Sequence, residues 1–277
     1  MRADEAAAAE EVARAALYAG REEPDPAQET RARRRLAHLQ RTDPGGAWVA
    51  EHDGALAGLA LALVREGIWG LSLFGVVPAL QGRGIGRRLL EASFDHGRDA
   101  RGHLILSTES PAAMRRYARL GLDLRPCVAA AGVVDPRRLD RAAALDGIDD
   151  GGPAGIPVAD AIGRAVRGAG HGTDLPVVLE DGGRLLLVED RAFALTREDR
   201  VMLVAGTDDE AATRALKAAL ASTPRGASVT VDFLTAGQDW AVRACLDAGL
   251  ALSPDGPFFT GGDLGPLRPY VPSGAYL

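Results

Sequence analysis

Residues 76–90 read Val-Val-Pro-Ala-Leu-Gln-Gly-Arg-Gly-Ile-Gly-Arg-Arg-Leu-Leu, the end of an apolar strand followed by a glycine-spaced turn and the start of a helix. Glycine adopts the tight turns that such a loop needs and lets the backbone come close to a ligand. The N–H groups of the helix's first turn, together with the helix dipole, favour a bound anion. The stretch therefore predicts a phosphate-binding loop, which a pyrophosphate would fit.

The spacing of the glycines separates three kinds of phosphate loop. A P-loop ends in Gly-Lys-Ser/Thr, whereas Gly86 is followed by two arginines and by no hydroxyl for magnesium. A dinucleotide fingerprint reads G-x-G-x-x-G, and the glycines at 82, 84 and 86 miss its third position. What remains is Gln-x-x-Gly-x-Gly after a Val-x-Pro strand end, which closely resembles the acyl-CoA loop of the GNAT superfamily of N-acetyltransferases. A glycine-rich turn without a ligand is the plain alternative.

A second stretch resembles the same family. After an apolar strand at 103–107, residues 110–122 read Ser-Pro-Ala-Ala-Met-Arg-Arg-Tyr-Ala-Arg-Leu-Gly-Leu, where the family usually has Asn-x-x-Ala-x-x-x-Tyr-x-x-x-Gly-Phe. The matching residues are Ala113, Tyr117 and Gly121, and the departures are Ser110 for Asn and Leu122 for Phe. Physically, Ser110 with Pro111 makes a good N-cap and first helical residue.

The resemblance implies acetyl-CoA as co-substrate and direct attack of an amine on the thioester. Backbone N–H groups of the loop would bind the pyrophosphate, and backbone groups of the preceding strand would bind pantetheine. The residues expected to contact acetyl-CoA are Phe74, Gly75, Val76, Gln81, Gly82, Arg83, Gly84, Ile85, Gly86, Arg87 and Ser110. Tyr117 would protonate the departing thiolate as general acid. The alternatives are a tyrosine that only packs on the sheet and arginines, Arg87 and Arg88, that only face solvent.

A general base is harder to assign, because residues 68–74 contain no carboxylate and Ser72 is their only polar side chain. The C-terminal stretch 265–277 is rich in proline and has two tyrosines, which predicts a docked segment. Some tandem relatives use their C-terminal carboxylate as base, so we hypothesise this catalytic role for Leu277. A tail that is merely packed is the alternative.

Composition limits the class of protein. The chain has 277 residues, which suits two modest domains, and a formal charge of −6, which disfavours nucleic-acid binding and mildly favours a cationic amine acceptor. No stretch is apolar enough for a membrane span, and the N-terminus does not resemble a signal peptide. Cys127 and Cys245 lack metal-like or redox spacing. We expect a cytoplasmic protein without a metal or membrane, either monomer or homodimer.

The pattern of elements predicts a mixed α/β domain over residues 1–140. Two helices, at 4–18 and 27–40, flank a turn at 22–26. Strands joined by hairpin turns follow, and then the strand, helix, strand, helix and strand that surround the two family stretches. The expected strands are 48–51, 56–64, 68–77, 103–107 and 128–134, and the expected later helices are 87–99 and one ending at Gly121.

After a linker at 141–157, the pattern returns in weakened form over 158–277. Setting Leu89 against Leu216 places Val201–Val204 over Phe74–Val77. The glycine loop is then replaced by Asp208, Asp209, Glu210, Ala211 and Thr213. Setting Gly121 against Gly249 places Cys245 where Tyr117 stands. Three carboxylates would repel a pyrophosphate. We interpret this half as a degenerate GNAT-like domain that does not bind CoA.

The fold expected is thus two tandem GNAT-like domains, each a mostly antiparallel twisted sheet flanked by helices. The function expected is acetyl transfer from acetyl-CoA to a primary amine of a small molecule. His171 and Asp174 are expected to shape the acceptor pocket. The alternative, which is the commoner one for such residues, is a histidine held in a loop by ordinary turn hydrogen bonds. The alternative function is a non-catalytic acyl-CoA-binding sensor or scaffold.

Overall fold

The computed structural model describes residues 1–17 and 24–277, which form two compact units, 1–104 and 105–277. Tyr18, at the end of the first predicted helix, and Glu22 and Glu23, in the predicted turn, lie outside the described residues.

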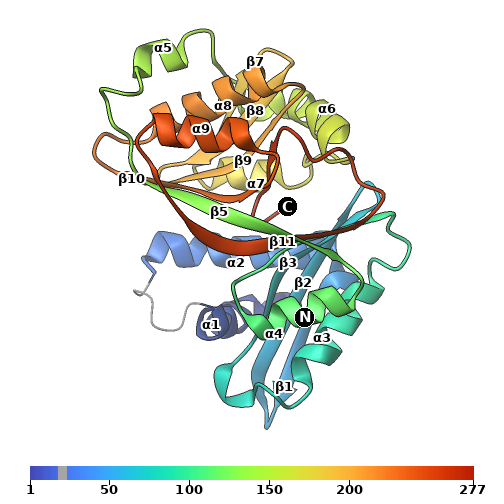
Figure 1. Cartoon of the computed structure of the whole chain (residues 1–277). Coiled ribbons are helices and arrows are strands. Elements are labelled where there is room, and N and C mark those ends of the chain that lie inside the picture. Colours follow the sequence, from blue (N-terminus) through green and yellow to red (C-terminus); the bar gives the residue numbers. More distant parts are fainter. Residues whose placement is uncertain (18–23) are drawn as a thin grey trace. The chain divides into compact units, whose positions relative to one another are not determined.

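Unit 1 carries helices around a sheet whose strand order is β1-β2-β3-β4 (Figure 1). Its elements are α1 (Ala6–Leu17), α2 (Pro26–Thr42), β1 (Ala47–His52), β2 (Ala55–Arg65), β3 (Ile68–Val76), α3 (Ile85–Asp95) and β4 (Gly102–Leu106), within which the division between the units falls. β1, β2 and β3 form an antiparallel meander. These elements lie close to their predicted ranges, although α3 begins two residues before the predicted start and ends at Asp95.

The two faces of β3 are covered by different helices. Val76 packs in one apolar cluster with Ile85 and Leu89 of α3. Gly75 points the other way, as successive strand residues do, and a Cβ there would lie 2.7 Å from the Cβ of Ala16 in α1. Helix α3 therefore covers one face of β3, and α1 covers the other.

A β-bulge interrupts β3 at Ser72. Its pairing with β2 shifts between Leu61↔Leu73 and Ala62↔Leu71, so that Ser72 is the extra residue. Arg35 of α2 donates from one guanidinium nitrogen to the Ser72 carbonyl oxygen (2.5 Å) and to its Oγ (2.6 Å). The bulge is thus held from the side of the sheet that faces α2.

β3 continues beyond the end of its neighbour β4. Both strands begin beside Gly67, whose carbonyl oxygen accepts from the backbone N–H groups of Arg101 (2.9 Å) and Gly102 (3.5 Å). β4 has five residues and β3 has nine, so the last residues of β3, Phe74–Val76, run past the end of β4. This is the stretch that the sequence predicts to bind pantetheine.

Unit 2 contains a sheet of strand order β11-β5-β10-β9-β8-β7-β6, with β12 beside β9. Only β9 and β10 run parallel among its paired strands. Its strands are β5 (Asp123–Val133), β6 (Asp149–Asp150), β7 (Arg184–Val188), β8 (Ala192–Arg197), β9 (Arg200–Gly206), β10 (Ser228–Thr235), β11 (Ala251–Gly262) and β12 (Tyr270–Val271). Its helices are α4 (Pro111–Arg119), α5 (Arg141–Leu145), α6 (Ile156–Val166), α7 (Leu175–Glu180), α8 (Asp209–Ser222) and α9 (Asp239–Asp247).

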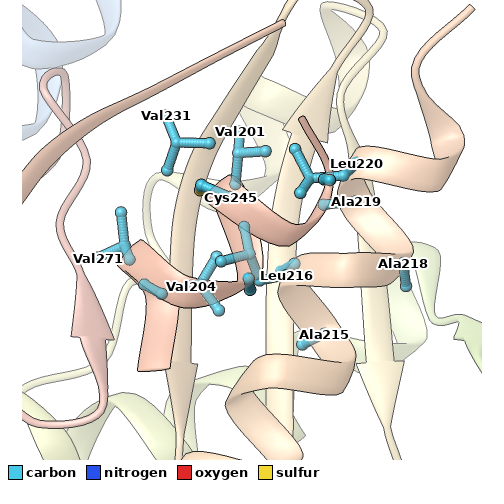
Figure 2. Packing of buried hydrophobic residues seen from close by; sticks show 14 of the residues in the cluster. Val201, Val204, Ala215, Leu216, Ala218, Ala219, Leu220, Val231, Cys245 and Val271 are labelled. Carbon is cyan, nitrogen blue, oxygen red and sulfur yellow. The ribbon is translucent and has the colours of Figure 1, made fainter. Parts of the chain in front are cut away.

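A large apolar cluster of unit 2 surrounds α8. Figure 2 shows Leu216 and Leu220 of this helix beside Val201 and Val204 of β9 and Cys245 of α9. The buried alanines of α8 are Ala211, Ala212, Ala215, Ala218, Ala219 and Ala221. Because these side chains are small, α8 packs closely against both the sheet and α9.

The division between the units differs from the predicted domain boundary at residue 140. β5 pairs along its length with β11 on one side and with β10 on the other, so it is a central strand of unit 2. The predicted linker 141–157 contains α5, β6 and a 3₁₀ turn at Gly152–Gly155, and β6 pairs with β7. A boundary read from composition could not reveal these long-range pairings. The assignment of domains to 1–140 and 158–277 stays a prediction.

The order of elements repeats along the chain. β9, α8, β10, α9 and β11 follow the same strand-helix order as β3, α3, β4, α4 and β5. At the start of α8, Asp208 accepts from the N–H of Ala211 (2.9 Å) and pairs with Arg191 (2.9 Å). The chain's own carboxylate thus caps the helix at the position that corresponds to the glycine loop.

No helix of residues 1–17 and 24–277 combines the length and the apolar character that crossing a bilayer requires.

Candidate functional site

The glycine loop lies between β3 and α3 and begins with a 3₁₀ turn at Pro78–Leu80. Gly82 (φ 80°) and Gly84 (φ 83°) have left-handed backbone conformations, and a Cβ at either position would meet no atom within 4 Å. The glycines are therefore required by the backbone conformation rather than by crowding. The space around both residues is open.

The loop is closed by its own glutamine. Gln81 Nε2 donates to the carbonyl oxygen of Val76 (3.0 Å), which ties the turn to the end of β3. Gln81 is exposed, whereas Ile85 and Leu89 are buried against the sheet. A rigid strand and a buried helix face thus hold an exposed turn between them.

The surroundings of the loop carry positive charge. Arg83, Arg87 and Arg88 are exposed, and residues 67–90 contain no carboxylate. Arg87 lies 3.8 Å from Glu91, whereas Arg83 and Arg88 make no ion pair with the part of the chain that the structure describes. Helical hydrogen bonding starts with the N–H groups of Arg87 and Arg88, which donate to the Gly84 carbonyl oxygen. The helix N-terminus and the arginines favour an anion here.

Ser110 and Tyr117, the residues of the second family stretch, belong to unit 2. Ser110 caps α4 by accepting from the N–H of Ala113 (3.5 Å). Tyr117 is buried, and its ring lies edge-on to Phe259 with centroids 5.4 Å apart. Burial raises the pKa of the Tyr117 phenol, and the charge of Arg116 lowers it by less. The phenol therefore keeps its proton at neutral pH, as a general acid must.

Leu277 is buried at the end of the described chain. Its carbonyl oxygen accepts from an Arg167 guanidinium nitrogen (2.7 Å), which also donates to the carbonyl oxygen of Tyr276 (3.3 Å). Arg167 is itself buried and donates to the carbonyl oxygens of Ala169 (3.2 Å) and Gly170 (2.7 Å). The docked C-terminal segment and the catalytic role of Leu277 both stay predictions.

His171 and Asp174 lie inside unit 2, with 1% and 0% of their surface exposed. The N–H of His171 donates to Asp160 (2.7 Å), and its Nε2 lies 3.3 Å from the Tyr270 hydroxyl. Burial raises the pKa of Tyr270 to about 12, an effect that Arg167 opposes. These contacts connect the loop after α6 to the C-terminal segment. A contact with the acceptor stays a prediction for both residues.

Three residues that the sequence did not single out are conspicuous in the structure: Glu10, Arg35 and Arg167. Each is a charged residue that the fold buries wholly or in part. Glu10 stands beside the exposed Glu11, so the pair looks like a solvated helix face. Only the alanines at positions 9, 13 and 16, which place the sheet-facing side of α1 next to Glu10, give a hint of its burial.

Solved structures share the fold of the whole chain. A candidate acetyltransferase from Pyrococcus horikoshii is 15% identical with a TM-score of 0.81, and the match covers 100% of this chain and 94% of that one. GCN5-related N-acetyltransferases from Sphaerobacter thermophilus (15% identity, 99% and 96% covered) and Kribbella flavida (14%, 95% and 70%) both give a TM-score of 0.57. No curated protein gives a significant match. Residues 11–122, which contain both family stretches, match the model of the acetyltransferase (GNAT) family.

Proposed function

We propose that the protein is an acetyl-CoA-dependent N-acetyltransferase that acetylates a primary amine of a small molecule. The observation that carries this proposal is the glycine loop, with its left-handed Gly82 and Gly84 open to solvent at the start of α3. It lies within the residues that match the GNAT family.

The proposed cofactor position follows the geometry of unit 1. The pyrophosphate binds the loop N–H groups, with Arg83 and Arg87 close enough in sequence to reach its oxygens. Pantetheine runs along Phe74–Val76, the part of β3 that extends past β4, and pairs with it as an added strand would. The thioester then lies toward the bulge at Ser72.

The proposed reaction is direct transfer. The amine attacks the thioester carbonyl carbon, a C–N bond forms, and the C–S bond breaks. Tyr117, whose burial keeps the phenol protonated, gives its proton to the leaving thiolate. The repeated second half, whose corresponding helix is capped by Asp208, contributes to the acceptor side and binds no CoA.

Calorimetric titration with acetyl-CoA tests this proposal. Gly84→Glu puts a side chain and a negative charge at a left-handed position of the loop, and we expect binding to fall at least 100-fold. Gly54→Glu is the matched control, because Gly54 has a similar φ (78°) and equally open surroundings at the β1–β2 turn of the same unit. Its backbone strain is the same, but it lies outside the loop.

The proposal requires one acetyl-CoA per chain for the wild type and for Gly54→Glu. Failure of the wild-type protein to bind acetyl-CoA would show that the loop is only a turn. An equal loss of acetyl-CoA binding in both variants would show that backbone strain is responsible, and not the position of Gly84 in the loop.

A further inference from the structure

Glu10 is a buried carboxylate, and one of its oxygens makes no hydrogen bond with the described part of the chain. The residue is 5% exposed, and its Oε2 makes no hydrogen bond within residues 1–17 and 24–277. No ion pair compensates it there either. A buried charge without a partner destabilises a protein, so a carboxylate kept in this condition points to a ligand.

The neighbours of Glu10 on α1 show where its side chain lies. Ala9 and Ala13 beside it are buried, and Ala16 meets β3 at Gly75. Arg14, one helical turn after Glu10 on the same side, pairs with Glu29 at the start of α2 (3.3 Å). Glu10 therefore points between the sheet and α2.

α1 and α2 run antiparallel. The Arg14–Glu29 pair joins the end of α1 to the start of α2, and the Met1 nitrogen donates to Ala47, just past the end of α2 (2.6 Å). One turn before Arg14, Glu10 lies level with the turn of α2 that follows Glu29, and Arg35 lies in the turn after that, about 9 Å beyond Glu29 along the helix. Arg35 reaches Ser72 at the bulge of β3. Glu10 thus shares the α1–α2 side of the sheet with the bulge.

This side is opposite to the side of the phosphate loop. Helix α3 and its loop cover the Val76 face of β3, whereas α1 covers the Gly75 face. Glu10 is six residues from Ala16, about 9 Å along the helix. An acceptor beside Glu10 would therefore approach β3 from the face that the cofactor's phosphates do not use.

We propose that Glu10 binds the acceptor's ammonium group and is the general base for its deprotonation. The proposal rests on the proposed acetyl transfer and supplies the base that β3 lacks. Oε2 takes one proton from the ammonium group, and the neutral amine attacks the thioester. The C–N bond forms, the C–S bond breaks, and the thiolate takes a proton from Tyr117. The second amine proton restores the Tyr117 phenol, and the proton on Glu10 leaves to solvent.

Thermal unfolding of Glu10→Gln and Glu11→Gln, without any substrate, gives the first test. Glutamine is isosteric and removes the buried charge, so we expect the melting temperature of Glu10→Gln to rise by about 3 °C. Glu11 is exposed on the next position of the helix, and its change should leave the melting temperature unaltered. A fall for Glu10→Gln would mean that the carboxylate has a structural partner, and would overturn the proposal.

Kinetics give the second test, with putrescine, ethanolamine and L-lysine as probes and thiol release as the signal. We expect kcat/KM for the amine to fall about 100-fold in Glu10→Gln at pH 7 and to recover toward the wild-type value at pH 10, where free amine is abundant. The affinity of Glu10→Gln for acetyl-CoA should stay within twofold of the wild-type value.

Other outcomes separate the two proposals. If the wild type does not bind acetyl-CoA, the proposed function fails. If it acetylates a probe and Glu10→Gln matches Glu11→Gln in rate, only the role of Glu10 fails. If acetyl-CoA binds but none of the three amines reacts, the melting comparison decides the proposal for Glu10.

Discussion

At the scale of single residues, the sequence reveals a functional position when its conformation demands one residue type. Gly82 and Gly84 could be predicted because the loop needs left-handed turns that glycine adopts readily. Glu10 could not, because an Ala-rich helix with two adjacent glutamates is ambiguous about which one is buried. Burial of Glu10 depends on how α1 lies across β3, which no local pattern specifies.

Tyr117→Phe tests the proposed general acid. We expect kcat to fall about 100-fold with unchanged affinity for acetyl-CoA, since only the hydroxyl is lost. Because burial raises the pKa of Tyr117 above its ordinary value near 10, the phenol stays protonated and wild-type kcat should not decline between pH 8 and pH 10 through its ionisation. Steady-state kinetics and calorimetry measure both quantities.

Tyr270→Phe is the control, as it removes a second buried phenol that touches His171. Its kcat should equal that of the wild type. A wild-type rate for Tyr117→Phe would leave Tyr117 as a packing partner of Phe259.

At the scale of elements, the strands and helices of unit 1 follow from periodicity, whereas their irregularities do not. The bulge at Ser72 arises from pairing with β2 and from the reach of Arg35, and neither is visible in a strand of apolar residues. Similarly, the stretch predicted as a linker contains α5 and β6, because β7 offers an edge for pairing. Glycine- and proline-rich composition indicates turns, but not what the turns pack against.

Arg167→Met tests how the C-terminal segment is held. The change leaves the carbonyl oxygens of Ala169, Gly170, Tyr276 and Leu277 without their donor, and we expect a loss of about 3 kcal/mol in the free energy of unfolding in urea. Chymotrypsin should also cut at Tyr270 sooner than in the wild type.

Arg164→Met, in the last turn of α6 just before Arg167, is the matched control. Arg164 is about half exposed and lies 3.7 Å from Asp160, so its loss should change stability by less than about 0.5 kcal/mol. Equal effects of the two variants would show that Arg167 does not secure the segment.

At the scale of the whole molecule, the repeat of element order was visible in the sequence and the strand pairing was not. β9–α8 follows the same order as β3–α3, yet Ala211 and Thr213 stand where Gly84 and Gly86 stand in the first copy, and Asp208 caps the helix. Because only the first copy has the glycine loop, we expect the whole chain to bind one acetyl-CoA. β5, which the sequence assigns to the first domain, lies between β10 and β11 because pairing partners are chosen in space and not by order in the chain.

Alkaline pH should destabilise the protein. Burial raises the pKa of Cys245 from about 9 to about 12, so between these values the unfolded thiol ionises while the folded thiol stays protonated. The unfolded state then binds fewer protons, and stability falls by about 1.4 kcal/mol per pH unit for this group. Below pH 9 the thiol is protonated in both states, and its full contribution to the free energy of unfolding is present. Urea unfolding at pH 8, 9, 10 and 11 measures the slope.

In Cys245→Ala, the free energy of unfolding should fall less steeply with pH, by the contribution of one proton. The slope that remains is due to Cys127 and Tyr270, because burial also raises the pKa of each of these groups to about 12. An unchanged slope would contradict the assignment to Cys245.

During synthesis on the ribosome, β5 emerges long before either of its neighbours. Its last residue is Val133, whereas β10 begins at Ser228 and β11 ends at Gly262. Both edges of β5 therefore stay unpaired until β10 and β11 have been made, and open edges pair readily with other chains. A chain that lacks β10 and β11 would leave both edges of β5 open, so truncation before Ser228 should promote association between chains.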